Sequence, residues 1–119
     1  MKREFVWTTA FQAGWKRCGF DDNDLARLEE DLLKDPKAGK VIAGTGKARK
    51  YRFEYERRGK SGSTRVIYVD FDIGEKICGL AVYAKADKAS LTNGEKNVIK
   101  KVIEAIEPYY NVASDKKEV

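Results

Sequence analysis

Histidine is absent from the 119 residues of this chain. That absence excludes the Ser-His-Asp triad, the Cys-His pair and every metal site that depends on an imidazole ligand. If the protein is a catalyst, its acids, bases and charge-stabilising groups must therefore be lysine, arginine, tyrosine or carboxylate side chains.

Other scarcities narrow the class of protein further. The two cysteines, Cys18 and Cys78, lie on apolar segments without Cys-x-x-Cys spacing, which predicts reduced core thiols rather than a disulfide. The carboxylates are scattered along the chain, so we expect neither a required metal nor another cofactor. No apolar run approaches the ~20 residues of a membrane span, and the first residues lack the apolar core of a signal peptide. The sequence predicts one cytoplasmic domain over residues 1–119.

The excess of positive charge is local. Residues 47–68 hold eight Lys and Arg against two Glu, whereas the segments on either side are nearly balanced. A cationic block with tyrosines set into it predicts a polyanionic partner. The alternative is a basic hairpin kept soluble by its charges.

Apolar spacing in the first third of the chain predicts a strand followed by two helices. Residues 4–7 are aromatic and β-branched, as in a strand. A capping box at Thr9 starts a helix that Gly19 ends. Residues 21–23 offer caps for a second helix, whose leucines recur at helical spacing until Pro36. These two helices form a predicted helical hairpin, with the leucines in the core.

The middle of the chain predicts a loop and then a sheet. Residues 36–46 are rich in glycine and form a loop with Val41 and Ile42 tucked beneath it. Strand alternation begins near Lys47. After the turn-rich segment 57–63, which we expect to be mobile, alternation resumes in two further strands. These strands cover residues 65–71 and 77–85, and the three strands make an antiparallel meander.

The last element is a helix. A capping box at Thr92 and Glu95 starts it, and an apolar face continues until Pro108 ends it. Residues 108–119 have little to bury and should form a frayed tail. The predicted fold is α+β, a small antiparallel sheet in the order βααβββα with an N-terminal helical hairpin and a C-terminal helix.

Four cations on the predicted strands could converge on one sheet face. Lys50 and Arg52 project from the same face of a strand, about 7 Å apart at strand rise. Arg65 begins the next strand, and Lys85 ends the one after it, with Tyr83 on the side of Lys85. Such a site suits cleavage of RNA by a 2′-hydroxyl that attacks the adjacent phosphate, because cations would neutralise the charge that builds on the phosphate oxygens.

Three segments taken together resemble the RelE superfamily of toxins from bacterial type II toxin–antitoxin pairs, and its HigB branch in particular. They are DLARLEEDLLKDPKAGKVIAGTGKARKYR, GKSGSTRVIY and LAVYAKADKASLT, within a resemblance over about residues 3–107. The resemblance implies the fold derived above, and an endoribonuclease (mRNA interferase) that cuts mRNA in the ribosomal A site and inhibits translation. It also implies a HigA-like antitoxin with a helix-turn-helix domain, through which alone operator DNA would be contacted.

The resemblance assigns roles by motif position. Lys50 and Arg52 match the paired basic residues of the second strand, Arg65 the arginine that opens the third, and Lys85 the basic residue that ends the last. The residues that follow Lys85 depart from the pattern, because Ala86 stands where many relatives have a second basic residue.

Binding of RNA and the ribosome is expected to involve more of the basic segment. A tyrosine that some relatives place before the last helix is missing here, so Tyr68 or Tyr83 is expected to stack on a base. The predicted binding residues are Lys47, Arg49, Arg57, Arg58, Lys60, Tyr68 and Tyr83.

Two other functions fit the same sequence. A ParE-like toxin would share the fold but poison gyrase without cutting RNA, and the paired basic residues on the sheet face favour the nuclease over it. A non-catalytic nucleic-acid-binding module would bind phosphates with a steep salt dependence and give no cut product.

Overall fold

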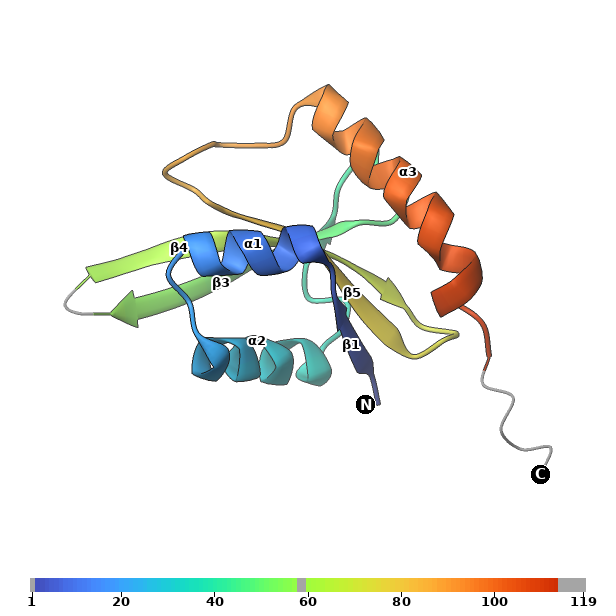
Figure 1. Ribbon diagram of the computed structural model, residues 1–119, viewed down its shortest axis with the longest axis horizontal. Coiled ribbons are helices and arrows are strands. Elements are labelled where there is room, and N and C mark those ends of the chain that lie inside the picture. The colour runs from blue at the N-terminus through green and yellow to red at the C-terminus, as the bar shows by residue number, and fades with distance from the viewer. Residues whose placement is uncertain (1, 58–59, 114–119) are drawn as a thin grey trace.

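The computed structural model describes residues 2–57 and 60–113, with the backbone alone for residues 55–57 and 60–62. Within this part the chain forms three helices and five strands (Figure 1). Their bounds are β1 Glu4–Trp7, α1 Thr9–Arg17, α2 Asp22–Lys34, β2 Lys40–Val41, β3 Arg49–Arg57, β4 Lys60–Phe71, β5 Lys76–Ala84 and α3 Asn93–Tyr110.

All five strands belong to one sheet, in the order β1-β5-β4-β3-β2. β3, β4 and β5 pair antiparallel with their neighbours in sequence, which confirms the predicted meander and the α+β class. β1 lies parallel to β5 at one edge, and β2 pairs antiparallel with β3 at the other. β2 falls within the segment 36–46 that we predicted as a loop, because two residues are too few to show strand alternation.

Each helix begins after a capping residue. Asp21 caps α2 and Thr92 caps α3, and both take part in reciprocal capping boxes. α1 begins one position before the predicted box, because its cap is Thr8, whose hydroxyl accepts a hydrogen bond from the Phe11 N–H at 3.1 Å. The same hydroxyl donates to the Gly79 carbonyl of β5 at 2.8 Å, so a contact distant in sequence selects the cap.

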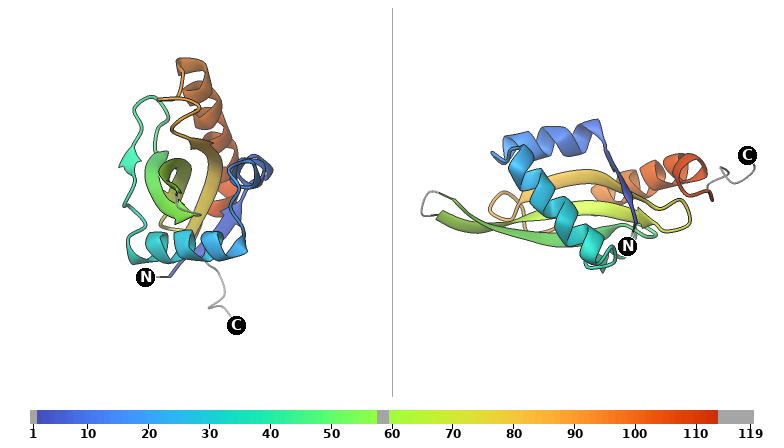
Figure 2. Two further views of the ribbon diagram at one scale, coloured as in Figure 1. Left: turned by 90° about the vertical axis from the view of Figure 1, so that its left-hand side faces the viewer. Right: turned by 90° about the horizontal axis from the view of Figure 1, so that it is seen from below.

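The helical hairpin of α1 and α2 covers one face of the sheet (Figure 2). Leu28 and Leu32 are fully buried, which confirms that the leucine stripe is core. A chain of aromatic rings runs from β1 through α1 to β3, and its neighbouring centroids lie 4.4 Å apart at Trp7–Phe11 and 5.6 Å apart at Phe11–Trp15. Because alternate residues of a strand point to opposite faces, Lys50, Arg52 and Glu54 of β3 project to the other side of the sheet.

α3 packs on that other face but covers only one end of it (Figure 2). Ile99 and Ile103 belong to the same buried apolar cluster as Val69 of β4 and Cys78 of β5. Burial raises the pKa of the Cys78 thiol to about 12, and both cysteines are free thiols, as the sequence predicts. Beyond α3, the extended part of β3 and β4 presents its open face without a helix among the described residues.

Three boundaries differ from those expected. β4 begins at Lys60, so residues 60–64 are strand, because pairing with β3 supplies hydrogen bonds that no local pattern reveals. α3 continues through Pro108 to Tyr110, since a proline in the last turn removes one backbone bond without disrupting the earlier turns. Val41 is 53% exposed instead of tucked beneath its loop, because it lies on an edge strand.

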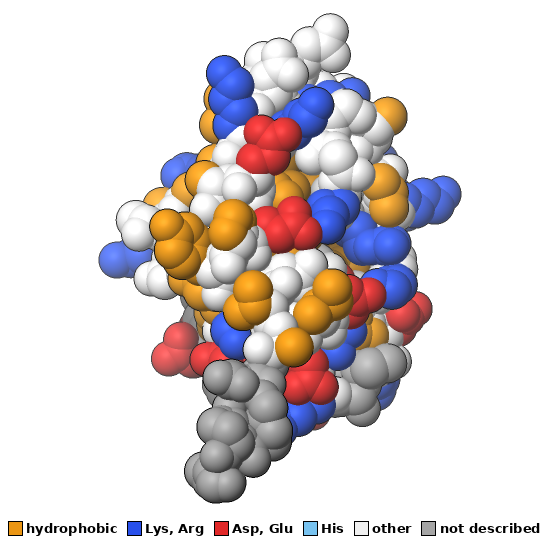
Figure 3. Space-filling view, turned by 90° about the vertical axis from the view of Figure 1, so that its right-hand side faces the viewer, with side chains coloured by type: hydrophobic (Ala, Val, Ile, Leu, Met, Phe, Trp, Pro, Cys, Tyr) orange, Lys and Arg blue, Asp and Glu red, His pale blue; other side chains and the backbone are white. Residues whose placement is uncertain are grey.

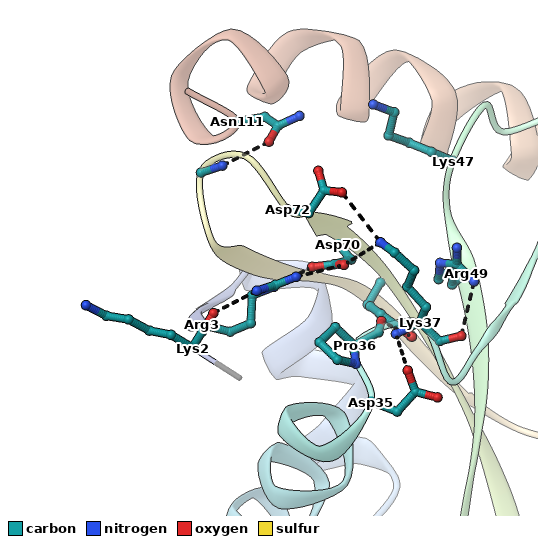
Figure 4. A network of polar contacts seen from close by, with 12 residues as sticks. Lys2, Arg3, Asp35, Pro36, Lys37, Lys47, Arg49, Asp70, Asp72 and Asn111 are labelled. Carbon is teal, nitrogen blue, oxygen red and sulfur yellow. Dashed lines mark hydrogen bonds and ion pairs between the residues drawn. The ribbon is translucent and has the colours of Figure 1, made fainter. Parts of the chain in front are cut away.

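The C-terminal end of α3 is joined to the turn between β4 and β5 (Figure 4). The Asn111 side-chain oxygen accepts a hydrogen bond from the Gly74 N–H at 3.1 Å. A Cβ atom at Gly74 would lie 1.8 Å from the Tyr110 carbonyl oxygen, so only glycine fits this contact. Residues 108–111 are therefore part of the folded domain rather than of a frayed tail, and residues 114–119 of the predicted tail lie outside the described part.

A buried carboxylate joins three segments of the chain (Figure 4). Asp70, near the end of β4, accepts hydrogen bonds from Arg3 at 2.7 Å and from Lys37 at 2.9 Å, and its side chain is 1% exposed. Burial alone would raise the pKa of Asp70, but the bonds from Arg3 and Lys37 outweigh it and hold that pKa below its ordinary value.

Asp70→Asn should lower the free energy of unfolding at pH 7 by about 3 kcal/mol, because it leaves the buried Arg3 without its charged partner. The folded pKa of Asp70 lies below the unfolded value of about 4, so its contribution is present above that value and is lost as the pH falls through the folded pKa. Urea unfolding of wild type and variant at pH 7 and pH 3 should show the difference shrinking. A difference that stays constant on acidification would contradict the charged pairing.

The end of the molecule where α3 terminates carries apolar and charged side chains side by side (Figure 3). The Ile73 side chain is 61% exposed there, and the Tyr109 side chain is 78% exposed.

Among the described helices, none combines the length and the apolar character that crossing a bilayer requires.

Candidate functional site: a basic cleft on the open sheet face

Two pairs of cations occupy adjacent rows on the sheet face that α3 leaves open. Arg52 of β3 lies directly across from Arg65 of β4, and Lys50, two residues along β3, lies directly across from Lys40 of β2. Directly opposed residues of neighbouring strands share a face, and rows two residues apart are separated by about 7 Å. All four residues line one cleft of about 510 Å³. The predicted convergence of Lys50, Arg52 and Arg65 is present in the structure.

Arg65 is the most enclosed of the four. It belongs to the central strand β4 and is 9% exposed, whereas the Arg52 side chain is 55% exposed. The Nη1 atom of Arg65 donates a hydrogen bond to the Ser63 hydroxyl at 2.9 Å. Because a guanidinium is planar and rigid, this bond limits the directions that its other donors can take, and such a fork matches two phosphate oxygens.

Among the described residues, Arg52 has one charged partner and is held weakly. Its guanidinium lies 3.7 Å from the Glu54 carboxylate, and both side chains are more than half exposed. An exposed pair of this kind contributes little free energy, so the Arg52 side chain can turn toward an anion in the cleft.

Tyr83 extends the arginine row onto β5, where it lies directly across from Arg65. It is 8% exposed, and within the described part of the chain its buried hydroxyl has no hydrogen-bond partner. Burial raises the pKa of Tyr83, against the opposing charges of Arg65 and Lys88. The phenol therefore remains a hydrogen-bond donor near neutral pH, but it exposes little ring surface on which a base could stack.

Lys40 is a residue of the cleft that sequence reasoning missed. It falls in the predicted loop, and neither charge density nor alternation distinguishes it. The pairing of β2 with β3 brings it across from Lys50. The available signal was the short run Lys-Val-Ile between glycines, which is typical of an extended segment.

Lys85 does not line the cleft. It follows the last residue of β5 and is exposed, and its N–H approaches the Ser63 carbonyl at 3.5 Å. It therefore lies beyond the arginine row, on the side of Ser63, and its predicted role stays a proposal.

Lys47 and Arg49 are engaged elsewhere in the structure. Lys47 forms an ion pair with Glu107 of α3 at 2.6 Å. Arg49 alternates with Lys50 and so faces the other side of the sheet, where it donates to the Gly39 carbonyl at 2.7 Å. Neither side chain lies in the cleft, so the proposed RNA site does not include them.

The structure contradicts the expectation that Tyr68 stacks on a base. Tyr68 is fully buried, and its hydroxyl accepts from the Gly39 N–H at 3.0 Å while donating to the Pro36 carbonyl at 2.7 Å. Its role is to hold the segment that leads into β2. The side chains of the remaining predicted binding residues lie outside the described part. They are Arg57, Arg58 and Lys60.

A larger groove on other elements of the fold is mostly apolar. A groove of about 630 Å³ between α1, β5 and α3 is lined mainly by apolar side chains such as Leu80 and Val98. Its lining includes one carboxylate, Glu95, and no Lys or Arg, so it does not suit a polyanion.

Across the described residues, no three Cys, Asp or Glu side chains gather closely enough to hold a metal ion.

No model of a known protein family matches the chain. Its structure is similar to that of the Escherichia coli toxin RelE, solved in the free state as a variant with two arginines replaced by alanine. The TM-score is 0.51 and the identity 13%, and the similarity covers 75% of this chain and 90% of the RelE chain. At 13% identity, this similarity establishes the fold alone. This protein has the RelE-like α+β fold.

Proposed function

We propose that this protein is the toxin of a type II toxin–antitoxin pair, of the HigB branch, and that it cleaves mRNA in the ribosomal A site. The observation that carries the proposal is the cleft in which Lys40, Lys50, Arg52 and Arg65 meet. The RelE-like fold and the resemblance of the sequence segments to the RelE superfamily support it.

The arrangement of charge in the cleft favours a function over a structural role. Like charges directly opposite each other destabilise a sheet, and two such pairs stand in adjacent rows here. Water and salt screen this repulsion only in part. The phosphates of a single-stranded RNA would supply the compensating negative charge, at the spacing of the rows.

In the proposed reaction the 2′-oxygen bonds to the adjacent phosphorus as the bond from phosphorus to the 5′-oxygen breaks. A base accepts the proton of the 2′-hydroxyl, and an acid protonates the leaving 5′-oxygen, which gives a 2′,3′-cyclic phosphate and a 5′-hydroxyl. Arg52 and Arg65 neutralise the charge that develops on the phosphate oxygens. Lys50 in the cleft and Lys85 at the end of β5 are the proposed proton-transfer groups, and no metal or cofactor takes part.

Expression of the chain alone in bacteria should arrest growth and translation within minutes, and co-expression with its antitoxin should restore both. We expect that antitoxin to be a helix-turn-helix protein encoded next to this gene. Mapping of mRNA 5′ ends should show cuts within translated codons. Arrest with DNA breaks but intact mRNA would favour a gyrase poison instead. Normal growth with abundant folded protein would contradict the toxin function altogether.

A further inference from the structure

The lysine row and the arginine row of the cleft are distinct. Lys40 and Lys50 face each other across β2 and β3, and Arg52 and Arg65 face each other one row further along. The rows are separated by about 7 Å, close to the reach between successive phosphates of an extended strand. We infer that the lysine row is a subsite for the phosphate that flanks the one being cut. This inference rests on the proposed function and adds to it a second phosphate-binding position.

Within the described ranges, the two lysines of this row have no carboxylate partner, unlike three lysines that hold other parts of the fold together. Lys37, Lys47 and Lys88 each form an ion pair with a carboxylate. In the part of the chain that the structure describes, no ion pair or side-chain hydrogen bond involves Lys40 or Lys50. Both ammonium groups are therefore available to an anion that enters the cleft.

The backbone before Lys40 is held against β3 by a contact that only glycine permits. A Cβ atom at Gly39 would lie 2.9 Å from the Lys50 carbonyl oxygen and 2.9 Å from the Tyr68 ring. The Tyr68 hydroxyl bridges the Gly39 N–H and the Pro36 carbonyl. The segment is thus fixed from inside the core immediately before it delivers Lys40 to the cleft.

Arg49 also holds the segment before Lys40 in place. It donates to the Gly39 carbonyl at 2.7 Å and to the Lys37 carbonyl at 3.2 Å. Lys37 is itself anchored to the buried Asp70. Because these contacts place the Lys40 backbone before a ligand arrives, a bound phosphate need order only the lysine side chain.

Lys40→Gln should weaken binding of a short RNA that carries a 2′-deoxy nucleotide at the cut position, so that it binds without being cut. We expect a loss of about threefold to fivefold at low salt, the scale of one exposed ion pair. The slope of log affinity against log salt should fall by about 0.7, as for one phosphate contact to a single strand. Fluorescence anisotropy across a salt series measures both. Lys40→Arg should bind like the wild type, and so should Lys16→Gln, a matched control on the exposed surface of α1.

An uncharged methylphosphonate placed at one linkage at a time locates the phosphate involved. With the flanking linkage neutral, wild type and Lys40→Gln should bind alike, and with the scissile linkage neutral their difference should remain. The inference is overturned if the wild type does not bind the RNA, if Lys40→Gln binds the unmodified RNA as well as the wild type, or if their difference survives every neutral linkage.

Cleavage of mRNA on ribosomes, measured on the same proteins, separates this inference from the proposed function. A mapped flanking phosphate without any cut product would leave the subsite standing and refute the nuclease. Cut mRNA with no dependence of binding on Lys40 would do the reverse.

Discussion

Arg65→Ala should slow single-turnover cleavage of mRNA on purified ribosomes by roughly 10²–10³-fold, the scale of losing one donor that stabilises transition-state charge. Arg65 is 9% exposed on the central strand, its guanidinium donates a hydrogen bond to Ser63, and it lies across from Arg52. Because the Arg65 side chain is already enclosed, it loses little further conformational entropy when charge develops on the phosphate oxygens. Ribosome affinity should fall far less, because the charge that Arg65 would neutralise develops mainly in the transition state.

Matched variants separate catalysis from folding and from bulk charge. Arg65→Lys keeps the charge but loses the planar fork, so it should recover part of the rate. Lys101→Ala, at an exposed position of α3, should cut like the wild type. Lys50→Ala and Lys85→Ala should slow the step and change its dependence on pH. Thermal unfolding of each variant checks that it folds. Wild-type rates in the Arg65, Lys50 and Lys85 variants together would refute the proposed mechanism.

A 2′-deoxy substitution at the cut position of the mRNA should abolish cleavage, because the attacking hydroxyl is then missing. Loss of the nucleophile removes the chemical step itself, so we expect no product above background where the natural mRNA is cut completely. Binding of this protein to the ribosome should be nearly unchanged, since one hydroxyl contributes little to a phosphate-dominated contact. Primer extension on mRNA assembled in the ribosome measures the outcome.

The control for this experiment is a 2′-deoxy substitution one nucleotide away, which should be cut at close to the natural rate. Product from the mRNA that lacks the attacking hydroxyl would show that water or another nucleophile attacks the phosphate. In that case the proposed mechanism would be wrong even though the mRNA is cut.

Features that depend on neighbouring residues were predictable from the sequence. The cap at Thr92 and the leucine stripe of α2 are confirmed, because capping and helical periodicity act within a few residues. Strand alternation placed Lys50 and Arg52 on one face, opposite the aromatic core. The lack of histidine by itself limited the chemistry to lysine, arginine, tyrosine and carboxylates.

Features that depend on pairing between distant segments were decided only by the tertiary structure. The register of β3 against β4 places Arg65 across from Arg52, and a two-residue strand brings Lys40 to Lys50. Burial likewise excludes Tyr68 from stacking on a base, and its hydroxyl instead holds the segment before that two-residue strand. Register and burial are properties of the whole packed domain, because strand partners and core neighbours are chosen by contacts far apart in the chain, which no local pattern of residues encodes.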